Sequence, residues 1–135
     1  MKQENLEYIR YRMAAAHETL TEARTLLDSG LLRGTVNRLY YACFYVVSAL
    51  LLTENLHSAK HSGVRSLFVR HWIKSKRLPT TLGDFYQRIF SHRQTGDYRD
   101  LADFGREDVE AWFREAQGFL DTVSQRIKEQ LQDEQ

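Results

Sequence analysis

The sequence is poor in cysteine, proline and glycine. Its 135 residues contain one cysteine, one proline and seven glycines. A lone cysteine cannot form a disulfide within the chain, and so few turn-forming residues disfavour an all-β fold with many tight turns. Neither sign of charge dominates, because 19 basic and 18 acidic side chains give a net charge of +1. Any binding to a nucleic acid must therefore come from a local patch.

Long hydrophobic runs are also missing. The longest, Leu39 to Leu52, covers about 14 residues and is interrupted by Ser48 and by tyrosines, whereas a helix that spans a bilayer needs about 20. The N-terminal residues lack the basic and apolar regions of a signal peptide. We therefore expect a cytoplasmic protein without membrane association, in which this run is a buried central helix.

Apolar side chains recur at intervals of three and four, which is the pattern of helices with one buried face. The pattern predicts five helices, at about Leu6–Leu27, Thr35–Glu54, Ala59–Ile73, Thr80–Gly96 and Arg106–Gln130. No repeat or interdomain linker interrupts them, so residues 1–135 are expected to form a single domain. With short connections, the prediction is an all-α fold: an antiparallel up-and-down four-helix bundle with an additional short helix.

The connections between these helices are expected at glycine-containing segments. Asp28-Ser29-Gly30 should end the first helix, because glycine readily takes the left-handed conformation, and the first turn would extend to Gly34. Gly96 is expected to end the fourth helix, with a polar, acidic connection from Asp97 to Gly105. Cys43 lies inside an apolar stretch of the second helix, where it is expected to act as a small core residue.

Three motifs carry a resemblance to a known family. They are Asn37-Arg38-Leu39-Tyr40-Tyr41-Ala42-Cys43-Phe44, His61-Ser62-Gly63-Val64-Arg65-Ser66-Leu67-Phe68 and Arg93-Gln94-Thr95-Gly96-Asp97-Tyr98, in that order after a long first helix. The chain resembles the HEPN domain family over almost its whole length, especially small stand-alone bacterial and archaeal members. The resemblance implies a homodimer, often paired with a small nucleotidyltransferase in toxin–antitoxin modules.

Active members of that family resemble metal-independent ribonucleases, and their motif is an Arg followed after four to six residues by a His. The resemblance places this motif at Arg93, but the residue after four intervening positions is Tyr98, not His. Tyrosine, with a pKa of about 10, is a poor base near neutral pH. Asp97 would orient either of these groups or pair with Arg93 across one helical turn. His92 is an alternative proton-transfer group, although it points about 100° away from Arg93 on a helix.

Other polar residues are candidates for ligand binding. Asn37 and Tyr41 share one face of the second helix, and Arg38 is the residue expected to reach a ligand. They would line the cleft or satisfy hydrogen bonds in the core. His61 and Arg65, four residues apart near the start of the third helix, would bind an anion or form a solvated face.

The sequence gives little indication of a metal or cofactor. His57 and His61 are four residues apart, but no cysteine or third ligand accompanies them, so we expect no metal site. No motif for an organic cofactor is present either.

Three functions remain open from the sequence. The first is a HEPN-type module that binds RNA or a nucleotide and acts as toxin or accessory subunit beside a nucleotidyltransferase. The second is a metal-independent RNA endonuclease with a divergent Arg-x4-Tyr site, and whether the chain is an enzyme is left undecided. The third is a structural helical adaptor without catalysis.

Overall fold

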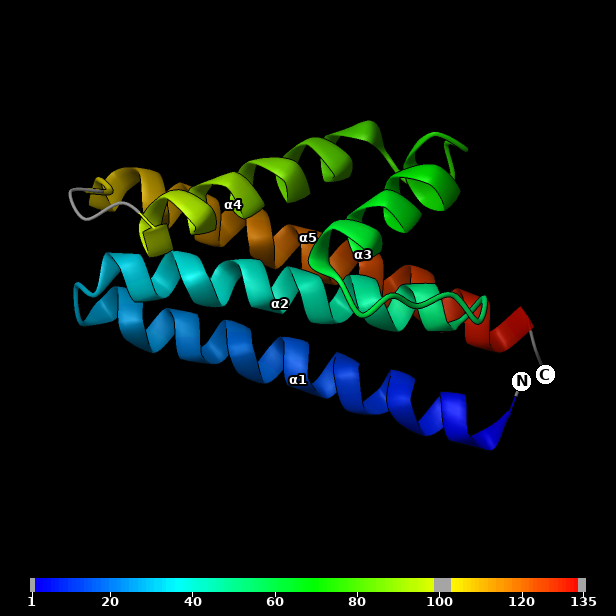
Figure 1. The fold of residues 1–135 in the computed structure, drawn as a ribbon. Helices are drawn as coiled ribbons and strands as arrows, with labels where there is room; N and C mark the ends of the chain where they lie inside the picture. Colours follow the sequence, from blue (N-terminus) through cyan, green and yellow to red (C-terminus); the bar gives the residue numbers. More distant parts are fainter. Residues whose placement is uncertain (1, 99–102, 134–135) are drawn as a thin grey trace.

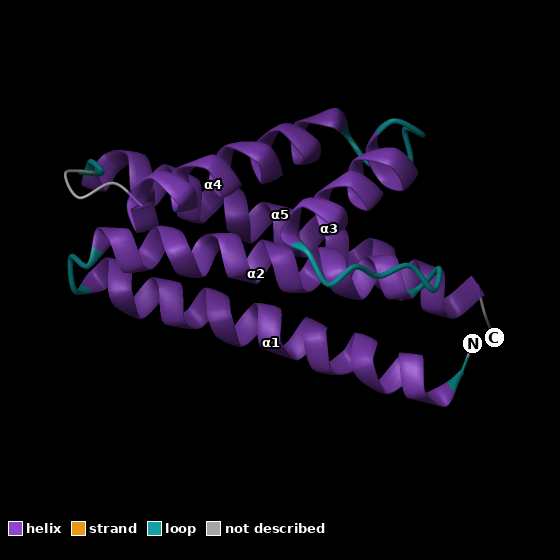
Figure 2. Cartoon of the chain, viewed as in Figure 1, coloured by secondary structure: helices purple, strands orange, loops and turns teal. Residues whose placement is uncertain are grey.

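The computed structural model describes residues 2–98 and 103–133, apart from the side chain of Tyr98. Within this part of the chain every regular element is a helix (Figure 1). The elements are α1 (Gln3–Asp28), α2 (Leu32–Leu52), α3 (His61–Phe68), the π-helical turn η1 (Val69–Ile73), α4 (Thr80–Tyr98) and α5 (Arg106–Asp133). Loops and turns join them (Figure 2). The predicted all-α fold with five main helices is confirmed.

The four long helices form an up-and-down bundle. α1, α2, α4 and α5 alternate in direction along the chain, and the start of α1 lies at the same end of the bundle as the end of α5 (Figure 1). α3 and η1 form a shorter arm between α2 and α4, which is the predicted additional helix. α2 packs against α1, α4 and α5 and also contacts α3, so it is the central helix of the fold.

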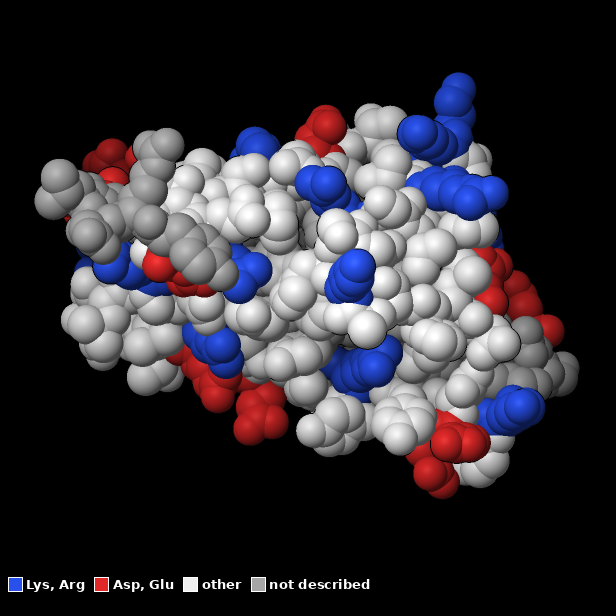
Figure 3. Space-filling model, in the orientation of Figure 1, with Lys and Arg blue, Asp and Glu red and all other residues white. Residues whose placement is uncertain are grey.

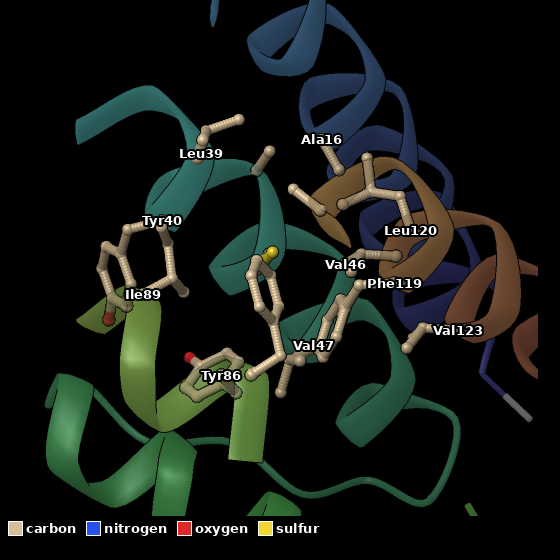
Figure 4. Close-up of a cluster of buried hydrophobic side chains, with 14 of the residues drawn as sticks. Ala16, Leu39, Tyr40, Val46, Val47, Tyr86, Ile89, Phe119, Leu120 and Val123 are labelled. Carbon is tan, nitrogen blue, oxygen red and sulfur yellow. The ribbon is translucent and has the colours of Figure 1, made fainter. Parts of the chain in front are cut away.

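The composition of α2 explains its central position. Thirteen of its side chains are buried, and they point in every direction around the helix axis. Figure 4 shows Val46 and Val47 of α2 beside Phe119 and Leu120 of α5, with Ala16 of α1 near by. By length and composition alone α2 could cross a membrane, but 72% of its apolar window is buried inside the protein. Such burial is typical of a core helix.

The end of α1 forms as the sequence predicts. Gly30 has φ +75°, its N–H donates to the Leu27 carbonyl at 3.0 Å, and the Leu31 N–H donates to the Leu26 carbonyl at 2.9 Å. These are the two hydrogen bonds of a Schellman motif. The predicted extension of the turn to Gly34 is wrong, because the Leu31 carbonyl already accepts the Thr35 N–H at 3.0 Å. Helical hydrogen bonding therefore starts at Leu31, and α2 begins at Leu32.

The predicted end of α4 at Gly96 is also wrong. The helix continues through Gly96 to Tyr98. A Cβ atom at Gly96 would lie 3.0 Å from the Phe104 ring and 3.3 Å from Cγ of Arg33, so this glycine allows close packing. It does not act as a helix stop. Asp97 consequently belongs to α4 and lies one turn after Arg93.

The third helix differs from its predicted form at both ends. It begins at His61, two residues later than expected, and its last turn is the π-helical segment η1. Cys43 agrees with its prediction as a small core residue, since its side chain is fully buried. Burial raises the pKa of the Cys43 thiol far above its usual value, which keeps it protonated and unreactive.

The packing of α2 predicts a large difference between two leucine substitutions. Leu50→Ala removes a fully buried side chain and should lower the free energy of unfolding by about 2 to 5 kcal/mol. Leu31→Ala, at a side chain that is 57% exposed, should change it by less than about 0.5 kcal/mol. Urea unfolding followed by circular dichroism measures both. Equal effects of the two substitutions would contradict the central position of α2.

Candidate functional site

Arg93 is the arginine on which the sequence motif depends, and α4 presents it at the surface of α2. Its Nε donates a hydrogen bond to Oδ2 of Asp97 at 2.9 Å, one helical turn later. The Arg93 side chain is only 13% exposed and that of Asp97 is 27% exposed. Because both lie on one face of α4, the carboxylate fixes the orientation of the guanidinium.

Two tyrosines of α2 form the surface against which Arg93 packs. The guanidinium carbon of Arg93 lies 5.1 Å from the ring centroid of Tyr40 and 5.3 Å from that of Tyr41. The two rings meet edge to face, with centroids 5.2 Å apart. Cation–π attraction therefore adds to the ion pair with Asp97. The terminal Nη atoms of Arg93 make no hydrogen bond with the described part of the chain, which leaves donors for a ligand.

Arg38 brings a second guanidinium to the same place. Its carbon lies 5.3 Å from the Tyr41 centroid, and its Nη2 donates to Oδ1 of Asn37 at 2.8 Å. Its Nη1 also lies 3.5 Å from a carboxylate oxygen of Glu22, which weakens but does not remove the local positive charge. Asn37 thus positions Arg38, and both arginines contact the ring of Tyr41.

His61 reaches the tyrosines from the start of α3. Its Nδ1 lies 2.6 Å from the Tyr40 hydroxyl, within hydrogen-bond distance. Its ring stacks on Phe44, with centroids 4.6 Å apart and an angle of 25° between the planes. Burial, and secondarily the charge of Arg93, lower the pKa of His61 below its usual 6.5. His61 is therefore neutral at pH 7.

The Tyr40 hydroxyl remains protonated in this environment. Burial raises the pKa of Tyr40 to about 12, against the opposing effects of Tyr86 and Arg93. Tyr86 of α4 lies beside it in the core, with ring centroids 6.0 Å apart (Figure 4). Burial also raises the pKa of Tyr86 well above 10. Tyr40 therefore acts as a neutral hydrogen-bonding group and not as a base.

We define the Arg93 site by the residues that these contacts connect. Its members are Asn37, Arg38, Tyr40, Tyr41, His61, Arg93 and Asp97. Arg65 lies at its border, because its guanidinium packs 5.5 Å from the Phe90 centroid and hydrogen-bonds to Gln87. Phe90 in turn contacts Tyr40, with ring centroids 5.5 Å apart.

Two residues that the sequence suggested as catalytic, His92 and Tyr98, are not among the members of the Arg93 site. His92 stacks on Trp112 of α5, with centroids 3.9 Å apart and an interplanar angle of 15°, and it also meets Phe104. Its ring is held on α5 and so does not contact the Arg93 site. Tyr98 is the last residue of α4, and its side chain lies outside the described part of the chain.

Sequence reasoning missed Tyr40 as a site residue, because an aromatic side chain within an apolar helix was assigned to the core. The helical spacing contained a usable signal, since Tyr40 lies three residues after Asn37 and four before Phe44.

The described residues contain no group of three or more His, Cys, Asp or Glu side chains placed to hold a metal ion.

Comparisons with known proteins identify the family of this chain. A family model described as HEPN domain matches residues 9–129. A Thermotoga maritima protein named "UPF0332 protein" is 46% identical over 128 residues, which cover 95% of each chain. Two Methanocaldococcus jannaschii proteins carry the name "Putative toxin". One is 33% identical and covers 83% of this chain and 76% of its own, and the other is 32% identical and covers 93% and 92%. This protein belongs to the HEPN domain family.

Proposed function

We propose that this protein is a toxin-type HEPN module that binds RNA as a homodimer through the Arg93 site. The observation that carries the proposal is the placement of the Arg93 guanidinium. Asp97 and two tyrosine rings hold it, while its terminal nitrogens make no hydrogen bond with the described residues. An arginine held in this way is suited to grip a phosphate with two parallel hydrogen bonds.

The aromatic residues of the site favour RNA as the ligand. Proteins bind single-stranded RNA by combining arginine contacts to phosphates with stacking of bases on aromatic rings. Tyr41 and Phe44 are both partly exposed beside Arg93 and His61, so a base can reach them. The site therefore offers a phosphate-binding group and a stacking surface within one nucleotide of each other.

A basic groove next to the site supports a ligand longer than one nucleotide. The groove has a volume of about 610 Å³, and Arg65, Arg70 and Lys74 line it together with Ser66, Val69, Gly83 and Gln87. Figure 3 shows basic side chains gathered over η1 and the loop that follows it. Since the chain as a whole is nearly neutral, this local patch is the place where a phosphodiester backbone gains attraction.

The toxin-type assignment rests on relatives and on the family resemblance. Two relatives that align with most of this chain carry the name "Putative toxin". We extend that role to this protein, together with a small nucleotidyltransferase as its partner, as the family resemblance implies. The target of the toxin is then RNA in the cytoplasm, and the nucleotidyltransferase limits the access of this protein to that RNA.

The proposed dimer would use the outer face of α2. Tyr45 is partly buried there and contacts the rings of Tyr41 and Phe44. Tyr45 would pair with the second copy, and Tyr41 and Phe44 would face the cleft between the copies. Aromatic side chains are enriched in protein interfaces, and a two-fold pairing of this face would bring two Arg93 sites together. RNA would then bind in the cleft that the two copies share.

Metal-independent RNA cleavage is the second candidate function. The observation that favours it is a neutral histidine next to the arginine, since a neutral imidazole can accept a proton. Binding alone does not require such a group.

One test of this proposal measures RNA affinity. Arg93→Ala removes the phosphate-binding group and should weaken binding of a single-stranded RNA by about 10- to 100-fold. It should also lower the salt dependence of the affinity by about one unit of log–log slope. Fluorescence anisotropy at several salt concentrations measures both quantities. Unchanged affinity and slope in a folded Arg93→Ala variant would exclude the Arg93 site as the RNA-binding site.

Arg106→Ala is the matched control for this experiment. Arg106 makes the same kind of ion pair through Nε, to Glu110 one helical turn later, but it lies on α5 outside the Arg93 site. Its substitution should leave RNA binding within about two-fold of the wild type, as expected for an exposed ion pair. Competition by adenosine monophosphate tests whether a free nucleotide binds as well as RNA does.

Another test concerns the dimer. The wild type should sediment with twice the mass of one chain, and Tyr45→Glu should convert it to a monomer, because the new charge would be buried at the interface. Tyr11→Glu is the control, since Tyr11 is 71% exposed on α1. Sedimentation velocity separates the two species. A monomeric wild type, or a dimer that survives Tyr45→Glu, would contradict the proposed interface.

A further inference from the structure

His61 and Arg93 come from different helices but lie against the same two tyrosine rings. The Arg93 guanidinium carbon is 5.1 and 5.3 Å from the centroids of Tyr40 and Tyr41. The His61 ring centroid is 5.6 and 5.8 Å from the same two centroids. The charge of Arg93 also acts on the pKa of His61, so a phosphate bound to Arg93 would bring its attached ribose near the imidazole.

Two contacts fix the orientation of the His61 ring. The Tyr40 hydroxyl lies 2.6 Å from Nδ1, and the stacked ring of Phe44 sets the plane of the imidazole. Nε2 makes no hydrogen bond with the described residues. When Nδ1–H donates to the Tyr40 oxygen, Nε2 carries the lone pair that a base requires. In that tautomer Nε2 is available to a ligand.

The groups that surround His61 favour its neutral form. From α2 it faces the phenols of Tyr40 and Tyr41, and from α4 it faces the cation of Arg93, which is paired with Asp97. Arg65 follows one turn later on α3 itself. No carboxylate forms an ion pair with His61 among the described residues. His61 is therefore able to accept a proton near pH 7.

We propose that His61 is the proton-transfer residue of the Arg93 site, acting on the ribose 2′-hydroxyl next to a phosphate held by Arg93. The proposal rests on the proposed function, because it requires RNA at this site. The proton-transfer residue is then on α3, whereas the sequence motif places it near the end of α4. Tyr40 is then a positioning residue, which acts through His61.

The step conserves atoms and charge without a metal or a redox partner. Nε2 of His61 takes the proton of the 2′-hydroxyl, and the 2′-oxygen forms a bond to phosphorus. The bond between phosphorus and the 5′-oxygen breaks, that oxygen takes a proton from water, and the protonated His61 returns its proton to the hydroxide that forms. The products are a 2′,3′-cyclic phosphate and a 5′-hydroxyl end. Arg93 stabilises the extra negative charge on the phosphate oxygens in the transition state.

The other candidates for this role are less well placed. His92 stacks on Trp112 of α5 and does not contact the Arg93 site. The pKa of Tyr40 is raised to about 12, so the phenol holds its proton at neutral pH. Among the described side chains of the site, His61 is the one that is neutral at pH 7 and whose Nε2, in the tautomer with Nδ1 protonated, carries a free lone pair.

The test is cleavage of a labelled RNA oligonucleotide by the intact protein in EDTA. The variants are His61→Gln, Tyr40→Phe and Arg93→Ala, with His57→Gln as the matched control, since His57 is exposed and lies four residues before His61. We expect His61→Gln to lower the cleavage rate by about 10²- to 10⁴-fold. Its RNA affinity should stay within about three-fold of the wild type, because Arg93 still holds the phosphate. His57→Gln should cleave at the wild-type rate.

The pH profile separates proton transfer from a structural effect. Cleavage by the wild type should rise with pH through the lowered pKa of His61, since only neutral His61 accepts a proton, and should level off above about pH 6.5. Tyr40→Phe removes the acceptor for Nδ1–H, which should slow cleavage about ten-fold and move this inflection to lower pH. Thermal unfolding of each variant checks that it is folded.

The possible outcomes separate the role of His61 from RNA binding at the Arg93 site. Cleavage that is lost in Arg93→Ala but normal in a folded His61→Gln, with the same pH profile, would overturn the role of His61 and leave the ribonuclease candidate intact. Absence of cleavage by a folded wild type that binds RNA would overturn both the cleavage and the role of His61, while RNA binding would stand. Cleavage of an RNA with a 2′-deoxy substitution at the cut position would also overturn the proposed step.

Discussion

The packing of α2 against α1, α4 and α5 is the constraint from which the site follows. Because α2 is buried on several sides, consecutive residues of this helix face different environments. Tyr40 is fully buried, whereas Tyr41 is partly exposed. Arg93 of α4 and His61 of α3 both pack on this pair of rings. A tyrosine pair on the central helix therefore brings together polar groups from three helices.

Burial gives these polar groups their chemical character. Asp97 and the tyrosine rings keep Arg93 charged and fixed, although its side chain is only 13% exposed. The same surroundings lower the pKa of His61 and raise that of Tyr40. At neutral pH the site thus contains a cation for a phosphate, a neutral imidazole and a neutral phenol. A contact that only held helices together would need neither the fixed cation nor the neutral imidazole. The combination is the one expected of a site that binds RNA.

The sequence predicted the features that depend on local patterns. Apolar spacing gave the helices, Gly30 gave the end of α1, and a spacing of four residues gave the ion pair of Arg93 with Asp97. Tertiary contacts were not predictable in this way. The stacking of His61 on Phe44 depends on how the segment between α2 and α3 folds back, and the stacking of His92 on Trp112 depends on the packing of α4 beside α5. These contacts decide which histidine reaches Arg93.

Photo-crosslinking tests the central claim most directly. A short single-stranded RNA that contains 4-thiouridine would be bound to the wild-type protein, irradiated, and the crosslinked peptides identified by mass spectrometry. Stacking of a base on the exposed aromatic face of α2 predicts crosslinks at Tyr41 or Phe44, and none on the outer face of α1, where Tyr8 and Tyr11 are exposed. Crosslinks concentrated on Tyr8 or Tyr11, with none on α2, would contradict RNA binding at the Arg93 site.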